Sequence, residues 1–123
     1  MSNFVIIKKK IGNFKKSIIV PGDKSLSIRW VLFASLANGK SKAKNLLMSE
    51  DVLAAIEAIK KLGIKVIIKK KECEVFGTGV EGYSYKKNLT INAQNSGTLG
   101  RLILGLLINS PEPINLIGDR SLS

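Results

Sequence analysis

The sequence contains no histidine and only one cysteine, Cys73. A single cysteine excludes an internal disulfide, and Cys73 lies in an alternating apolar and charged stretch that is typical of a strand. The absence of histidine excludes Ser-His-Asp and Cys-His catalysis and most zinc sites. Any chemistry must therefore rest on lysine, arginine, hydroxyl, amide and carboxylate groups, a set well suited to binding anions.

Long apolar runs are also missing. No stretch reaches the roughly 18 residues that a membrane span requires, and the first residues lack the regions that make up a signal peptide. We therefore expect a cytoplasmic chain with its natural start and no membrane partner. With 123 residues, of which 45% are apolar, the chain is expected to form at most one folded domain.

Acidic residues are scarce, since 9 of them stand against 20 basic residues and the net charge is +11. This excess suggests an anionic partner, and nucleic acid is the first candidate. The lysines, however, occur in scattered short runs, and only 6% of the residues are aromatic, so no basic stripe interleaved with aromatics is evident. We expect no nucleic-acid partner and keep a small basic nucleic-acid-binding protein as an alternative. Arginine, the better donor to carboxylate and phosphate, occurs at three isolated points: Arg29, Arg101 and Arg120.

Periodicity and turn residues predict a mixed chain of strands and helices, which favours an α/β or α+β layer structure. The helix at 99–108 is apolar on nearly all sides and is expected to be buried. Strands 64–68 and 72–76 flank three lysines and predict a hairpin. The other predicted elements are strands 4–7 and 17–20 with a turn at 11–13, helix 27–38 stopped by Gly39, a helix opened by Ser49 and closed by Gly63, a loop at 77–82, and strands 89–91 and 114–117.

The first candidate site is the segment Pro21–Arg29, where a strand is expected to become a helix. A helix N-terminus offers free N–H groups and partial positive charge to an anion. Lys24 is expected just outside the first turn, and Ser25 and Arg29, four residues apart, share a helical face if the helix begins there. The alternative interpretation is a helix cap with incidental charges.

The second candidate site is the segment Asn95–Arg101, which has the same order of strand, polar turn and helix. Gly97 lets the backbone approach a ligand closely, and Thr98 follows it. Arg101 is the lone charge in an apolar helix, which is costly unless the guanidinium meets an anion or a carboxylate. A structural ion pair is the alternative interpretation.

These two segments, followed by Gly118–Leu122, resemble in order and spacing three signature segments of the 5-enolpyruvylshikimate-3-phosphate synthase family, and Leu47–Val52 resembles the segment between its first two helices. The resemblance implies transfer of the enolpyruvyl group of phosphoenolpyruvate to shikimate 3-phosphate, without a metal or cofactor, in the shikimate pathway. It also implies a partial enolpyruvyl transferase fold, an inside-out α/β barrel of βαβαββ units. This chain would be its N-terminal portion, with a hairpin over residues 1–22 that pairs with a missing C-terminal domain. Residues 23–123 would form an incomplete substrate-binding domain of a monomer.

The same resemblance assigns individual residues. Lys24 matches the lysine that contacts both substrates and is the catalytic candidate. Ser25 and Arg29 match contacts to shikimate 3-phosphate, and Gly97 matches the glycine beside phosphoenolpyruvate. The residues expected around that anion are Asn95, Thr98 and Arg101.

The segments also depart from the family pattern. Asp23 stands where many relatives have Ser, Leu102 where many have Pro, and Gly100 in place of a larger residue. Groups from the C-terminal domain are absent, so the active site is expected to be incomplete. A related enzyme acting on UDP-N-acetylglucosamine is a further alternative, but it lacks the Lys-Ser-Leu-Ser-Ile-Arg pattern.

Overall fold

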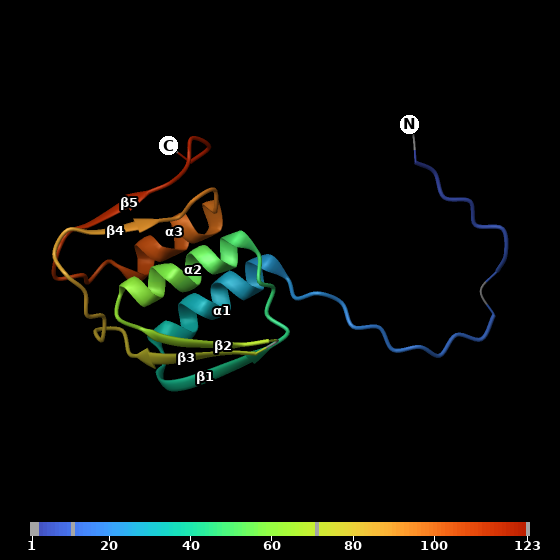
Figure 1. Ribbon diagram of the computed structural model, residues 1–123, viewed down its shortest axis with the longest axis horizontal. Helices are drawn as coiled ribbons and strands as arrows, with labels where there is room; N and C mark the ends of the chain where they lie inside the picture. The colour runs from blue at the N-terminus through green and yellow to red at the C-terminus, as the bar shows by residue number, and fades with distance from the viewer. Residues whose placement is uncertain (1–2, 11, 71, 123) are drawn as a thin grey trace.

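Three helices lie between two small sheets, and a long N-terminal segment extends away from this body (Figure 1). The computed structural model describes residues 3–10, 12–70 and 72–122. None of the helices in this part of the chain is long and apolar enough to cross a membrane. The elements are α1 (Lys24–Leu36), β1 (Asn38–Lys44), α2 (Glu50–Lys61), β2 (Lys65–Lys69), β3 (Glu72–Thr78), β4 (Leu89–Asn92), α3 (Gly97–Leu106) and β5 (Ile114–Ile117).

The larger sheet has the order β1-β3-β2, with both pairs antiparallel. The predicted hairpin is confirmed as β2 and β3, and the residue that joins Lys70 to Glu72 lies outside the described residues. In the second sheet β4 and β5 are parallel. Parallel neighbours need a crossover connection, and α3 provides it.

The core forms where the helices meet both sheets. The apolar face of α2 contributes Val52, Ile56 and Ile59, each at most 1% exposed. Val75 of β3 closes the core on one side and Ile91 of β4 on the other, both fully buried. The helices are thereby held in fixed positions, so their N-terminal ends have a defined spacing. The core residues contributed by α1 and α3 are Ile28, Val31, Leu32, Ala34, Leu99 and Ile103.

The predicted strands at 4–7 and 17–20 do not form. Both segments are extended, outside any sheet, and their apolar side chains are exposed, with Val5 at 90% and Ile19 at 87%. A strand needs a partner edge for its N–H and C=O groups, and no described residue of the body offers one to these segments. The predicted turn at 11–13 includes residue 11, which lies outside the described residues.

Other boundaries also differ from the predictions. The helix predicted at 27–38 runs over Lys24–Leu36, because Asp23 caps it three residues earlier. Its predicted stop, Gly39, lies instead in strand β1, which the sequence did not predict. The lysine-rich segment of β1 has little intrinsic strand preference and is a strand because it pairs along β3. Gly77 and Thr78, expected in a loop, extend β3.

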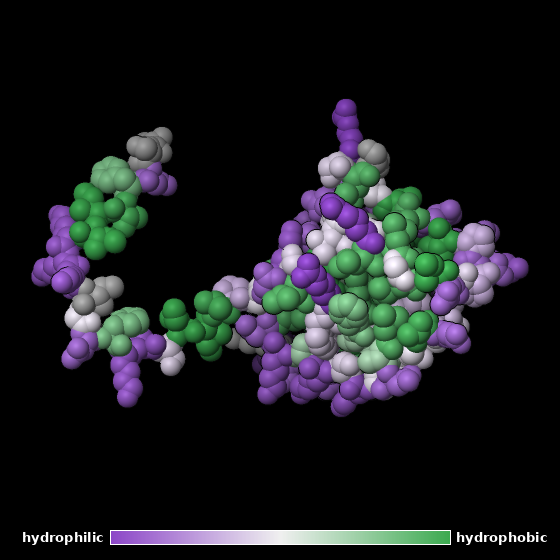
Figure 2. All heavy atoms as spheres, turned by 180° about the vertical axis from the view of Figure 1, so that it is seen from behind, coloured by the Kyte–Doolittle hydropathy of each residue, from purple (hydrophilic) through white to green (hydrophobic). Residues whose placement is uncertain are grey.

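Helix α3 is less buried than predicted. Only Leu99 and Ile103 are buried in it, whereas Leu104 is 57% exposed and Leu102 is 38% exposed. On α1, Leu26 and Phe33 are exposed as well. Figure 2 shows a broad apolar area on the rear of the body. The apolar character of α3 therefore exceeds what the described residues can cover.

Candidate functional site

The first turn of α1 is closed by a side-chain cap. Asp23 Oδ1 accepts a hydrogen bond from the Leu26 N–H at 2.7 Å, and the Asp23 carbonyl oxygen accepts from both the N–H and the hydroxyl of Ser27. Aspartate and serine are about equally good at an N-cap position. Asp23 therefore caps the helix as well as the Ser expected from the family pattern would.

Lys24 lies at the first position of α1 and makes an ion pair. Its Nζ is 2.9 Å from Oδ2 of Asp51, which lies in the first turn of α2. Sequence reasoning selected Lys24 and missed Asp51 as a site residue. The segment Leu47–Val52, noted for its resemblance, contained the signal that could have found Asp51.

Three further contacts fasten the start of α1 to the chain that leads into α2. Ser27 Oγ accepts a hydrogen bond from the Leu47 N–H at 3.1 Å, and the Asn45 side chain donates to the Val20 carbonyl oxygen at 3.0 Å. Gly22 packs so closely that a Cβ there would collide with the Asn45 carbonyl oxygen. The Pro21-Gly22 turn therefore needs glycine for this close approach.

The first turn of α3 repeats the design of α1. Ser96 is the N-cap, and its hydroxyl accepts a hydrogen bond from the Leu99 N–H at 3.3 Å. Gly97 follows at the first helical position and faces Arg101, because a Cβ at Gly97 would lie 3.0 Å from Nη2 of that arginine. Asn95, just before the cap, is exposed. Both predicted anion-binding segments thus end in a capped helix N-terminus.

A surface hollow of about 220 Å³ joins the two segments, and it is lined by Arg29, Thr98, Arg101 and Leu102. Arg29 comes from α1 and the other three residues from α3. Neither arginine makes an ion pair with another residue in the described ranges. Two planar cations and a hydroxyl with no carboxylate between them form an arrangement that attracts an anion. Sequence reasoning had not singled out Leu102 as part of this lining.

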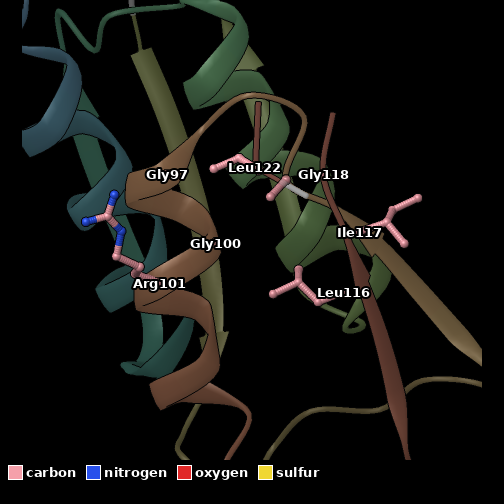
Figure 3. Close-up of a pocket in the computed structure, with 8 residues that line it drawn as sticks. Gly97, Gly100, Arg101, Leu116, Ile117, Gly118 and Leu122 are labelled. Atoms are coloured by element: carbon pink, nitrogen blue, oxygen red, sulfur yellow. The ribbon is translucent and has the colours of Figure 1, made fainter. Parts of the chain in front are cut away.

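The structure places Arg101 differently from the prediction. Its side chain is exposed, whereas a buried charge was expected. In Figure 3 the guanidinium is directed away from Leu116 and Ile117 of β5. The structural ion pair that was the alternative interpretation is not found among the described residues. Ser25, one turn before Arg29 on α1, is half-buried.

The third segment folds back toward the first turn of α3. Gly118 and Leu122 lie together with Gly97 and Gly100 around a neighbouring pocket of about 310 Å³ (Figure 3). The turn is held by Asp119, whose Oδ1 accepts hydrogen bonds from the N–H and the hydroxyl of Ser121 at 2.8 and 2.5 Å. The hydrogen bond from the hydroxyl is the main cause that lowers the pKa of the Asp119 carboxyl.

Comparison with known proteins adds a decisive observation to this geometry. Residues 8–123 match the family described as EPSP synthase (3-phosphoshikimate 1-carboxyvinyltransferase). The chain belongs to the EPSP synthase family. This membership confirms the family that the three signature segments indicated.

Individual members agree in sequence and fold. The 3-phosphoshikimate 1-carboxyvinyltransferases of Streptococcus pyogenes serotypes M49 (strain NZ131) and M4 (strain MGAS10750) are each 40% identical over 117 residues, which is 95% of this chain and 27% of the relative. Two solved structures of EPSP synthase from Acinetobacter baumannii superpose with a TM-score of 0.75 at 34% identity, covering 86% of this chain and 24% of the other. The predicted partial enolpyruvyl transferase fold is therefore confirmed, and the chain spans about a quarter of the length of these EPSP synthases.

Proposed function

We propose that this chain forms the N-terminal part of an enzyme that transfers the enolpyruvyl group from phosphoenolpyruvate to shikimate 3-phosphate and releases phosphate. The observation that carries this proposal is the hollow in which Arg29 meets Thr98 and Arg101. Both substrates are anions that bear a phosphate and a carboxylate, for which arginine is the preferred bidentate donor. Membership of the EPSP synthase family supports the same reaction.

We assign substrate contacts to residues in or just before the first turns of α1 and α3. Lys24 is proposed to contact both substrates and to act in catalysis, while Ser25 and Arg29 bind shikimate 3-phosphate. Gly97 is proposed to lie beside phosphoenolpyruvate. The groups proposed to surround that anion are Asn95, Thr98 and Arg101.

The rest of the site is proposed to come from residues beyond this chain. The described part of residues 1–22 lies outside any sheet and exposes apolar side chains at 4–7 and 18–20, which supports the proposal that a hairpin over this segment pairs with a C-terminal domain. Residues 23–123 are then an incomplete substrate-binding domain. We further propose that the complete protein is a cytoplasmic monomer that needs neither metal nor cofactor.

The reaction can be tested with the complete protein that carries this chain. Phosphate release should require phosphoenolpyruvate and shikimate 3-phosphate together, and it should persist after treatment with a chelator. UDP-N-acetylglucosamine in place of shikimate 3-phosphate should give no release. Turnover of the nucleotide sugar without turnover of shikimate 3-phosphate would contradict the proposal, and the 123-residue chain alone should be inactive.

A further inference from the structure

Lys24 carries more of the proposed chemistry than any other residue, and its side chain is long and half exposed. The exposed fraction of the Lys24 side chain is 53%, against 16% for Asp51, its ion-pair partner at 2.9 Å. A lysine side chain has four rotatable carbons and loses much conformational freedom when it is held in one place. A partner that restricts it before substrate arrives therefore has a direct effect on how well the ammonium group is placed.

Asp51 is suited to be that partner because the fold holds it firmly. It lies in the first turn of α2, where the helix dipole stabilises a carboxylate. The next residue, Val52, is fully buried in the core. The packing of α2 therefore fixes the backbone from which the Asp51 carboxylate projects.

The distance between the two helix starts is also set independently of the ion pair. Ser27 of α1 is hydrogen-bonded to the Leu47 N–H, and Gly22 packs directly against the Asn45 carbonyl oxygen. Both contacts join the start of α1 to the chain just before α2. Asp51 thus faces Lys24 across a gap that the backbone defines.

We propose that Asp51 is a positioning residue that holds the Lys24 ammonium group ready for the two substrates. An ammonium group has three N–H donors. One is directed to Asp51, and two remain for two anionic ligands, which matches the proposed contact of Lys24 with both shikimate 3-phosphate and phosphoenolpyruvate. This inference rests on the proposed function.

Glu50 provides a matched control next to Asp51. It is also a carboxylate in the first turn of α2, but it is exposed and makes no ion pair with another residue in the described part of the chain. Glu50→Gln and Asp51→Asn therefore remove the same favourable interaction with the helix dipole. Only Asp51→Asn removes the anchor of Lys24.

The test is a steady-state double-mutant cycle in the complete protein, with Asp51→Asn, Lys24→Met, the double variant, Asp51→Glu and Glu50→Gln. Asp51→Asn should lower kcat/KM for both substrates together by about tenfold to a hundredfold, as a misplaced group does. The double variant should be no worse than Lys24→Met, because the effect of Asp51 acts through Lys24. Asp51→Glu should restore part of the activity, and Glu50→Gln should keep all of it, with thermal unfolding confirming that each variant is folded.

Different outcomes would overturn different statements. If the unmodified complete protein turns over no shikimate 3-phosphate, both the proposed function and this inference fail. If it is active and Asp51→Asn matches Glu50→Gln, the inference alone is wrong. Additive losses in the double variant would also overturn it, because they would assign Asp51 an effect that does not pass through Lys24.

Discussion

Arg29 and Arg101 come from helices that are far apart in the sequence, yet both line one hollow without a carboxylate partner within the described ranges. Two like charges held together are unfavourable unless solvent or an anion compensates them. Both side chains are exposed, so water screens the repulsion. An arriving phosphate would meet two donors already in place, which makes these side chains the best points at which to test the proposed ligands.

Gly97→Ala in the complete protein should raise the KM for phosphoenolpyruvate more than the KM for shikimate 3-phosphate. The added methyl group would lie 3.0 Å from Nη2 of Arg101, so the guanidinium must shift while the backbone also becomes less accessible. We expect an increase of about tenfold, equivalent to roughly 1.4 kcal/mol of binding. Steady-state kinetics with each substrate varied in turn measures this, and an equal rise in both constants would contradict the assignment of Gly97.

Arg29→Ala should have the opposite effect and weaken the binding of shikimate 3-phosphate more than that of phosphoenolpyruvate. A hydrogen bond to a charged group contributes about 1.5–3 kcal/mol, which corresponds to roughly a tenfold to hundredfold increase in KM. Arg29→Lys keeps the charge and should recover only part of the loss, because lysine lacks the bidentate geometry. A selective effect on phosphoenolpyruvate would show that the two substrates are assigned to the wrong helices.

Among the elements, the two N-terminal segments at 4–7 and 17–20 have strand-forming residues but no strand. Phe4, Val5, Ile18 and Ile19 are all at least 77% exposed. Local preference favours an extended backbone, and the exposed apolar side chains and unpaired amides both favour a partner edge. These segments run as an extended trace (Figure 1) and make no backbone pairing with another strand among the described residues.

Hydrogen exchange tests this explanation directly. In the 123-residue chain, the amides of 4–7 and 17–20 should exchange at nearly the unprotected rate, because no described backbone group accepts from them. In the complete protein their exchange should slow by about tenfold or more as they pair with added strands. Amides in the middle of α2 should be protected in both proteins, and equal exchange of the N-terminal amides in both would refute the pairing.

The turn at 118–122 should respond to acid through Asp119. Because the pKa of this carboxyl is lowered in the folded chain, its stabilising effect is present above the unfolded pKa. The effect is lost as the pH falls through the lower, folded pKa. Ser121→Ala should raise the pKa of Asp119 by removing the main hydrogen bond, whereas Ser121→Thr should keep it low. A carboxyl-detected NMR titration reports the value, and an unchanged pKa in Ser121→Ala would refute this cause.

For the molecule as a whole, the net charge of +11 does not form one continuous positive surface. On the outer face of the larger sheet, Nζ of Lys42 lies 2.6 Å from Oε2 of Glu72. Lys40 and Lys44 also form ion pairs with glutamates of β3. Surface pairs of this kind contribute little to stability. They do interrupt the positive field, so this face does not present the continuous basic surface that nucleic acid requires.

Binding of the 123-residue chain to DNA should therefore be weak and non-specific. Contacts between scattered lysines and phosphates release counterions, so the apparent affinity should fall steeply with salt, by about 10³-fold or more between 50 and 200 mM if about six phosphates are contacted. Mobility-shift titrations on two unrelated sequences should give the same result. Sequence-selective binding that survives physiological salt would instead support the nucleic-acid alternative.

The local features of this protein could be predicted from the sequence. The hairpin of β2 and β3, the helix that follows Ser49 and the polar turns that lead into α1 and α3 depend on residues within a few positions of each other. The order of the motifs was sufficient to identify the family, because three such short segments rarely occur together in one chain by chance. The exact start of α1 was predicted wrongly, because the capping hydrogen bond of Asp23 begins the helix at Lys24.

Features that depend on distant partners could not be predicted. Strand β1 exists because of its pairing with β3, and α3 keeps an exposed apolar side because Leu99 and Ile103 are its only described residues that the core buries fully. The ion pair of Lys24 with Asp51 and the hollow shared by Arg29 and Arg101 arise only when α1 packs against α2 and α3. Periodicity along the sequence predicts which face of a helix is apolar, but the packing of separate helices decides which side chains come into contact.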